Sequence, residues 1–165
     1  MKKHHEADPR VQEGNVYIFG GGHVSQELVP VLKRIGYTVF VYEDSGQHSA
    51  ADMFPGADGI IVHDFTKISD KITFGDADYA VVMTRGHEHD LEVLEQTLKT
   101  PVRYVGCMGS ASKRGATTKR LREAGVSEDA LGKLHSPIGI KIKAETPAEI
   151  AISIAAEMIL LKAAN

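Results

Sequence analysis

Residues 16–25 read VYIFGGGHVS, an apolar run that ends in three consecutive glycines. With Gly20, Gly22 and Ser25 in its three fixed positions, this stretch fits the G-x-G-x-x-G/A pattern that joins strand to helix in dinucleotide-binding folds. Gly20 permits a tight turn, and Gly22 lets backbone amides approach a pyrophosphate at the helix N-terminus. The stretch therefore predicts a strand, a glycine loop and a helix, with an anion site at the loop; a purely structural turn is the alternative.

Apolar runs of this kind recur along the chain. Each has four to six residues and is apolar throughout, which is typical of strands buried on both faces. The runs cover residues 16–19, 38–42, 59–62, 79–83 and 102–107. Apolar residues at helical spacing predict the helices 24–35, 87–98, 110–124 and 147–161. Residues 43–58 show only a weak helical pattern, and 63–78 stay unassigned.

Strands that alternate with helices predict an α/β fold with right-handed crossovers. The expected architecture is a Rossmann-like, doubly wound parallel sheet in three layers, with strand order 3-2-1-4-5. It forms a single domain over residues 16–165. Residues 1–15 are polar and aperiodic, which indicates a flexible N-terminal lead-in.

The last predicted helix, 147–161, has the clearest start. Thr146 is a natural N-cap, and Glu149 completes a capping box with it. Glu149, Ser153 and Glu157 form one narrow polar stripe, and nearly every other residue of the helix is apolar. Such a helix must be covered on most sides, and we expect a second copy of the chain to provide part of the cover.

Composition excludes several classes of protein. Of the 165 residues, 42% are apolar and 25% charged, as in ordinary globular domains, which excludes wholesale disorder. A formal net charge of −3 argues against a dedicated nucleic-acid binder. No membrane-spanning stretch and no signal peptide are evident. The single cysteine, Cys107, suits a reducing cytoplasm, which is the expected location.

Two acids end the second predicted strand. Glu43 lies 21 residues after Gly22, where a dinucleotide-binding fold holds the ribose 2′-hydroxyl, and Asp44 follows it. Two carboxylates here disfavour a 2′-phosphate. NAD, ADP-ribose or a dinucleotide-like ligand therefore fits better than NADP.

The fourth predicted strand ends in the segment 84–90, TRGHEHD, which we expect to face the glycine loop across the crevice where open α/β sheets bind ligands. Arg85 is the best candidate there, because a guanidinium can bind a phosphate or carboxylate through two hydrogen bonds. His87, His89 and Asp90 resemble metal ligands by type. Their spacing favours solvated residues; contact with a ligand without a metal is the alternative, ahead of a metal site, so no metal ligand is assigned.

The fifth predicted strand is followed by Gly109 and Ser110, with Ser110 as the expected N-cap of the next helix. Lys113 and Arg114 would lie in its first turn, where cations oppose the helix dipole, so a compensating anion is expected. A solvated basic helix is the alternative. Cys107 is interpreted as a small core residue, with a reactive or metal-contacting thiol beside these cations as the alternative.

Hydrolytic and phosphoryl-transfer motifs are not apparent. The chain has no Ser/His/Asp order, no Walker lysine and no cysteine pair for zinc. No catalytic residue is therefore assigned, and an enzymatic activity stays uncertain.

Several segments together resemble the xanthine dehydrogenase accessory proteins of the XdhC/CoxI family. The resemblance begins at Tyr17-Ile18-Phe19-Gly20-Gly21-Gly22-His23-Val24 and continues through 84–90, 104–110, 136–140 and 145–154, over about 140 residues. It covers the C-terminal Rossmann-like domain of that family. The family's N-terminal domain is not covered, which implies a separate chain that supplies it.

This resemblance implies a non-catalytic accessory role. Such proteins bind molybdenum cofactor, as molybdopterin or its cytosine dinucleotide, assist its sulfuration and deliver it to a xanthine dehydrogenase-type hydroxylase. A homodimer and a cysteine desulfurase partner are further implications, and neither nucleic acid nor membrane is an expected partner. An NAD(P)-binding oxidoreductase and a nucleotide-sensing regulatory module remain the alternatives.

The residues above and the resemblance together define one expected cofactor site. Its members are Gly20, Gly21, Gly22, His23, Val24, Glu43, Asp44, Thr84, Arg85, His87, Gly109, Ser110, Lys113 and Arg114.

Overall fold

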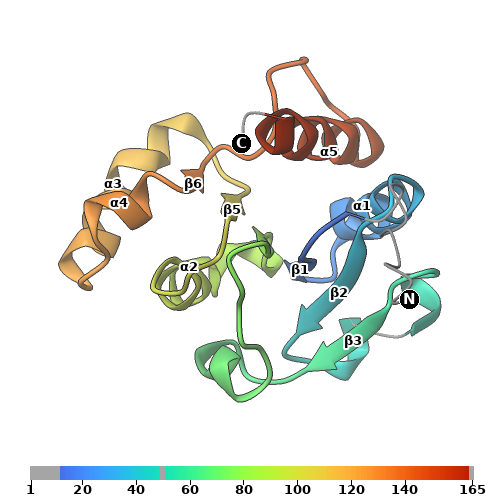
Figure 1. Ribbon diagram of the computed structural model, residues 1–165, viewed down its shortest axis with the longest axis horizontal. Coiled ribbons are helices and arrows are strands. Elements are labelled where there is room, and N and C mark those ends of the chain that lie inside the picture. The colour runs from blue at the N-terminus through green and yellow to red at the C-terminus, as the bar shows by residue number, and fades with distance from the viewer. Residues whose placement is uncertain (1–11, 49–50, 164–165) are drawn as a thin grey trace, which may run out of the picture.

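Six parallel strands form the centre of the molecule in the computed structural model, which describes residues 12–48 and 51–163. The strands are β1 (Asn15–Phe19), β2 (Thr38–Glu43), β3 (Gly59–Val62), β4 (Tyr79–Val82), β5 (Tyr104–Cys107) and β6 (Leu134–His135). Their order across the sheet is β3-β2-β1-β4-β5-β6 (Figure 1). The predicted order of the first five strands is confirmed, and β6 extends the sheet at one edge.

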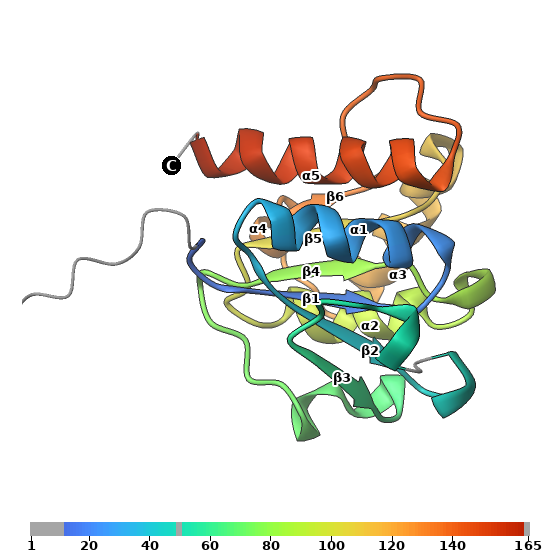
Figure 2. The same cartoon turned by 90° about the vertical axis from the view of Figure 1, so that its right-hand side faces the viewer.

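Helices cover both faces of this sheet. The α-helices are α1 (His23–Arg34), α2 (Asp90–Leu98), α3 (Arg114–Glu123), α4 (Glu128–Leu131) and α5 (Pro147–Ala163). Short 3₁₀ helices are η1 (Gly46–His48), η2 (Ala51–Met53), η3 (Phe65–Asp70), η4 (Arg85–His87) and η5 (Ala111–Lys113). Helices α1 and α5 lie side by side on one face, and α2 and α3 lie on the other (Figures 1 and 2). The Rossmann-like three-layer α/β fold is thus confirmed.

Each face of the sheet has its own apolar core. Leu28 and Leu32 of α1 and Ile154 of α5 pack with strand residues such as Ile18 on one side. Leu94 of α2 and its neighbours pack on the opposite side. Successive strand side chains point to opposite faces, so both sets must be apolar. This is why the strands appear in the sequence as continuous apolar runs.

Helix ends follow the expected local chemistry at two places. Gly36 adopts φ +93° directly after α1, and Tyr37 N–H donates to the Leu32 carbonyl. At the start of α5, Glu149 N–H donates to Thr146 Oγ1 and Thr146 N–H donates to Glu149 Oε2. The predicted capping box is therefore confirmed.

Other boundaries differ from expectation. Strand β6 and helix α4 were not predicted, because two and four residues are too short to show a hydrophobic period. The helix expected over 87–98 begins at Asp90, after η4. The helix expected over 110–124 begins with η5, and α3 proper starts at Arg114. The two uncertain segments contain 3₁₀ turns rather than long helices.

Ser110 occupies the N-cap position of η5, where the expected helix begins. Its side chain makes no capping hydrogen bond to the backbone, and its Oγ lies 3.0 Å from Ser112 Oγ instead. The position before α3 is Lys113, whose side chain does not cap the helix either.

Two residues of the polar stripe of helix α5 face the interior. Of its polar stripe, Ser153 donates to the Ile140 carbonyl and Glu157 Oε1 accepts from Tyr104 Oη at 2.7 Å, so both side chains face the interior. Ile152, Ile159 and Leu160 are 54%, 46% and 62% exposed. The helix is apolar towards solvent as well as towards the sheet.

The two ends of the described chain meet. Gln12 N–H donates to the Gly36 carbonyl, and Lys162 Nζ donates to Gln12 Oε1 at 2.7 Å. Most of the expected lead-in, residues 1–11, lies outside the described residues. Within the part of the chain that the structure describes, no helix has the length and apolarity to cross a lipid bilayer.

Candidate functional site

Gly20 forms the tight turn that the fingerprint requires. Its φ is +109°, and a Cβ atom there would lie 2.1 Å from the Met83 carbonyl oxygen of the neighbouring β4 segment. Its amide donates to the Tyr42 carbonyl, and Ser25 Oγ donates to the Gly20 carbonyl. Ser25 thus closes the loop from the first turn of α1, which explains a small hydroxyl side chain at the third position of the motif.

Glu43 contacts the glycine loop directly. Its buried carboxylate accepts from Gly21 N–H at 2.8 Å through Oε2 and from Asp44 N–H at 3.0 Å through Oε1. The carboxylate predicted to bind a ribose therefore ties the end of β2 to the loop after β1. Each of its oxygens already accepts a backbone amide.

The remaining loop amides are open. Gly22, His23 and Val24 donate no backbone hydrogen bond to any residue within 12–48 or 51–163. A Cβ atom on Gly22, whose φ is −74°, would meet nothing within 4 Å. This end of α1 has both the donors and the space for an anionic group.

Asp90 organises the segment after β4. Its Oδ1 accepts from Thr84 N–H at 3.0 Å and from Thr84 Oγ1 at 2.6 Å. Its Oδ2 lies 2.7 Å from His87 Nδ1. Because a carboxylate only accepts, Nδ1 carries the hydrogen and Nε2 is the ring nitrogen left for a ligand. Sequence reasoning treated Asp90 as solvated, whereas it is buried and fixes Thr84 and His87.

Cys107 also donates to Asp90. Its Sγ lies 3.8 Å from Asp90 Oδ2, and the residue is buried at the end of β5. Burial and the Asp90 carboxylate raise the pKa of the thiol well above its ordinary value. The cations expected nearby do not lower it, so this thiol stays protonated at neutral pH and is not an activated nucleophile.

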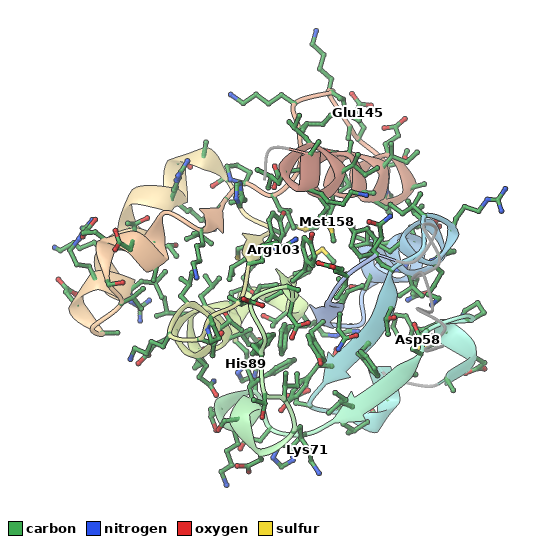
Figure 3. All side chains as sticks on the ribbon, viewed as in Figure 1. Asp58, Lys71, His89, Arg103, Glu145 and Met158 are labelled. Carbon is green, nitrogen blue, oxygen red and sulfur yellow. The ribbon has the colours of Figure 1, made fainter. Side chains whose placement is uncertain are left out.

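Asp44 follows β2, and Arg85 and His89 follow β4. Asp44 Oδ2 is 3.7 Å from His89 Nε2, which joins the ends of β2 and β4 across the first strand. His89 is labelled in Figure 3. Its ring packs on Phe65 of η3, and the two ring centroids lie 5.1 Å apart. Arg85 is exposed. No group of three His, Cys, Asp or Glu side chains within the described ranges is arranged to hold a metal ion.

A pocket of about 540 Å³ opens between α2 and α3, at the carboxyl ends of β4 and β5. Of the expected site it gathers His87, Gly109, Ser110, Lys113 and Arg114. It adds residues that were not expected, chiefly Asp90, Cys107, Arg120 and Ser136. The glycine-loop residues, Glu43, Asp44, Thr84 and Arg85 do not line it. The expected single site is thus divided between the glycine loop and this pocket.

Comparison with known proteins identifies the family to which this domain belongs. Residues 16–158 match the XdhC Rossmann domain. The chain belongs to this family. Among curated XdhC relatives, a probable xanthine dehydrogenase subunit of Bacillus subtilis (strain 168) is 31% identical over 142 residues, which are 86% of this chain and 41% of that protein. The uncharacterized protein YqeB of Escherichia coli (strain K12) is 27% identical over 146 residues, 88% of this chain and 27% of that protein.

A solved structure gives the same result for the XdhC domain. A xanthine dehydrogenase from Bacillus halodurans superposes with a TM-score of 0.80 at 32% identity, over 92% of this chain and 43% of that one. The chain spans less than half the length of these relatives. The predicted resemblance is confirmed, and the likeness concerns this domain of longer proteins.

Proposed function

We propose that this XdhC domain binds molybdenum cofactor, as molybdopterin or its dinucleotide, and assists its sulfuration and insertion into a xanthine dehydrogenase-type hydroxylase. The observation that carries this function is a cation-lined pocket at the ligand-binding edge of the sheet, in a chain of the XdhC family. Two relatives bear the name of xanthine dehydrogenase.

The residues present fit such a group. Molybdopterin carries a phosphate and its dinucleotide a pyrophosphate, and Lys113 and Arg114 supply cations at the pocket wall. The open amides of Gly22, His23 and Val24 offer a second anchor for the dinucleotide form. The role of the chain is to bind, orient and release its ligand, and these steps need no proton transfer.

Partners follow from the same proposal. The hydroxylase receives the cofactor, and a cysteine desulfurase provides sulfur in the cytoplasm. We also propose a homodimer through α5. Antiparallel packing of two copies buries Ile152 and Leu160 and brings Glu149 of one copy towards Lys162 of the other, which gives charge complementarity.

The test is to express the chain together with the cofactor pathway and to analyse the purified protein for molybdenum and for pterin fluorescence. Equimolar molybdenum and pterin are expected. Gly22→Val is expected to lower the content of the dinucleotide form, because its side chain occupies space in front of the open amides. Bound NAD without pterin would contradict the proposal and favour the oxidoreductase or nucleotide-sensing alternatives.

A further inference from the structure

The basic side chains along η5 and α3 form two groups, those that line the pocket and those that do not. Lys119 lies 3.9 Å from Glu123, and Arg122 is paired with Glu128. Neither Lys119 nor Arg122 lines the pocket. The cations that turn away from the pocket therefore have carboxylate partners of their own.

The cations that line the pocket do not. Lys113, Arg114 and Arg120 lie on one side of the helical segment, at i, i+1 and i+7, and all three line the cavity. Across the described ranges, no carboxylate lies within ion-pair distance of any of them. Unpaired cations in a chain of net negative charge mark this wall as a site for an anion.

The Asp90 carboxylate also lines the pocket, but it does not neutralise that wall. Its oxygens already accept from Thr84, His87 and Cys107, and it lies beyond ion-pair distance of the three cations. The surface that remains opposite the cations is largely apolar and comes from Leu91, Leu94 and Met108. A ligand that fits has a multiply charged anionic group at one end and an apolar body at the other.

We propose that the α2–α3 pocket binds a phosphate monoester. The phosphate lies against Lys113, Arg114 and Arg120, and a ring covers Leu91, Leu94 and Met108. Guanidinium groups match phosphate oxygens through paired hydrogen bonds, and three cations around one group favour a dianion over a single carboxylate. The identity of the natural ester rests on the proposed function; the existence of the site does not.

This assignment separates the pocket from the glycine loop. Gly22 and its neighbours are absent from the pocket lining, so the loop contributes nothing to phosphate monoester binding. A ligand with only one phosphate uses the pocket alone. The loop becomes relevant only for a dinucleotide, whose second half extends along the sheet edge.

Calorimetric titration of the purified chain with phenyl phosphate tests the site. Saturable binding is expected, and it should weaken as salt is added. Arg114→Ala and Arg120→Ala should each weaken binding by about tenfold, since each removes a charge-assisted contact. Lys119→Ala is the matched control on the same helix and should change affinity by less than about twofold. Methyl phosphate, which lacks the ring, should bind several-fold more weakly than phenyl phosphate.

Specific outcomes overturn the site. These are no binding of phenyl phosphate at millimolar concentration, an equal loss from Lys119→Ala and Arg120→Ala, or a loss from Gly22→Val as large as that from Arg120→Ala. Circular dichroism confirms that each variant is folded. If phenyl phosphate binds as expected while no molybdenum or pterin copurifies, the proposed function fails and the site stands. If cofactor copurifies undiminished in Arg114→Ala and Arg120→Ala, the function stands and the site fails.

Discussion

Gly20 and Gly22 are two residues apart in one loop, but only Gly20 has a backbone conformation and surroundings that require glycine. Gly20 has φ +109° and no room for a Cβ, so Gly20→Ala should lower the free energy of unfolding by about 2 kcal/mol or more. Gly22 has an ordinary φ and open space beside it, so Gly22→Ala should change the free energy of unfolding by less than about 0.5 kcal/mol. Urea denaturation of both variants measures the difference. Equal destabilisation would contradict the loop geometry.

His135 predicts a pH dependence of stability. Burial lowers its pKa from the ordinary value of 6.5; the Glu157 carboxylate opposes this shift, and Arg114 adds to it. The unfolded chain therefore binds a proton more readily than the folded one, and the free energy of unfolding falls as the pH drops below about 6.5. His135→Gln should make this decline shallower.

Denaturation curves recorded between about pH 5.5 and 7.5 provide the check. The carboxyl groups with lowered pKa, such as Asp58 and Glu149, lose their stabilising effect only at more acidic pH and do not interfere. An unchanged slope in His135→Gln would show that another group controls stability in this window.

Some site residues follow from local patterns and others do not. The glycines, Lys113 and Arg114 were expected because motif and helix start are contiguous in sequence. Arg120 shares the pocket because it follows Lys113 by seven residues, two helical turns, so a helical period applied to the charges would have found it. Ser136 enters the pocket after β6, a strand too short for any periodic signal.

At the scale of single elements, α5 shows what periodicity misses. Its sequence contains one polar stripe, and within one copy of the chain the other faces are covered only towards the sheet. Cover by a second copy stays a prediction. Ser153 and Glu157 turn inwards because the Ile140 carbonyl and the Tyr104 hydroxyl are available there as partners. Those partners come from distant segments, which a local pattern does not contain.

The outward face of α5 predicts self-association. Ile152→Glu combined with Leu160→Glu should convert the dimer to a monomer, because two like charges would be buried in each half of the interface. Both side chains are exposed within one copy, so the midpoint of thermal unfolding of the monomer should not fall by more than a few degrees. Sedimentation equilibrium measures the mass. A wild-type chain that is monomeric at micromolar concentration would refute the interface.

Over the whole molecule, the order of the first five strands could be predicted because alternating strands and helices with a glycine loop after the first strand are typical of the doubly wound dinucleotide-binding fold. The position of the ligand crevice follows in turn, because β1 and β4 are neighbours although they are not consecutive. The division of the site in two did not follow. It depends on the space between α2 and α3, and the packing of two helices against each other cannot be predicted from the sequence of either helix alone.

The contact between Gln12 and Lys162 has a topological consequence. The two ends of the described chain lie close together, because Lys162 contacts Gln12. A short Gly/Ser linker can therefore join residues 12 and 163 without disturbing any strand. New ends opened in the exposed loop at residues 141–144 should give a circular permutant with the same cooperative unfolding and the same hydrodynamic radius. In that permutant, the N- and C-termini would lie near the opposite end of α5, and the strand order of the sheet would be unchanged.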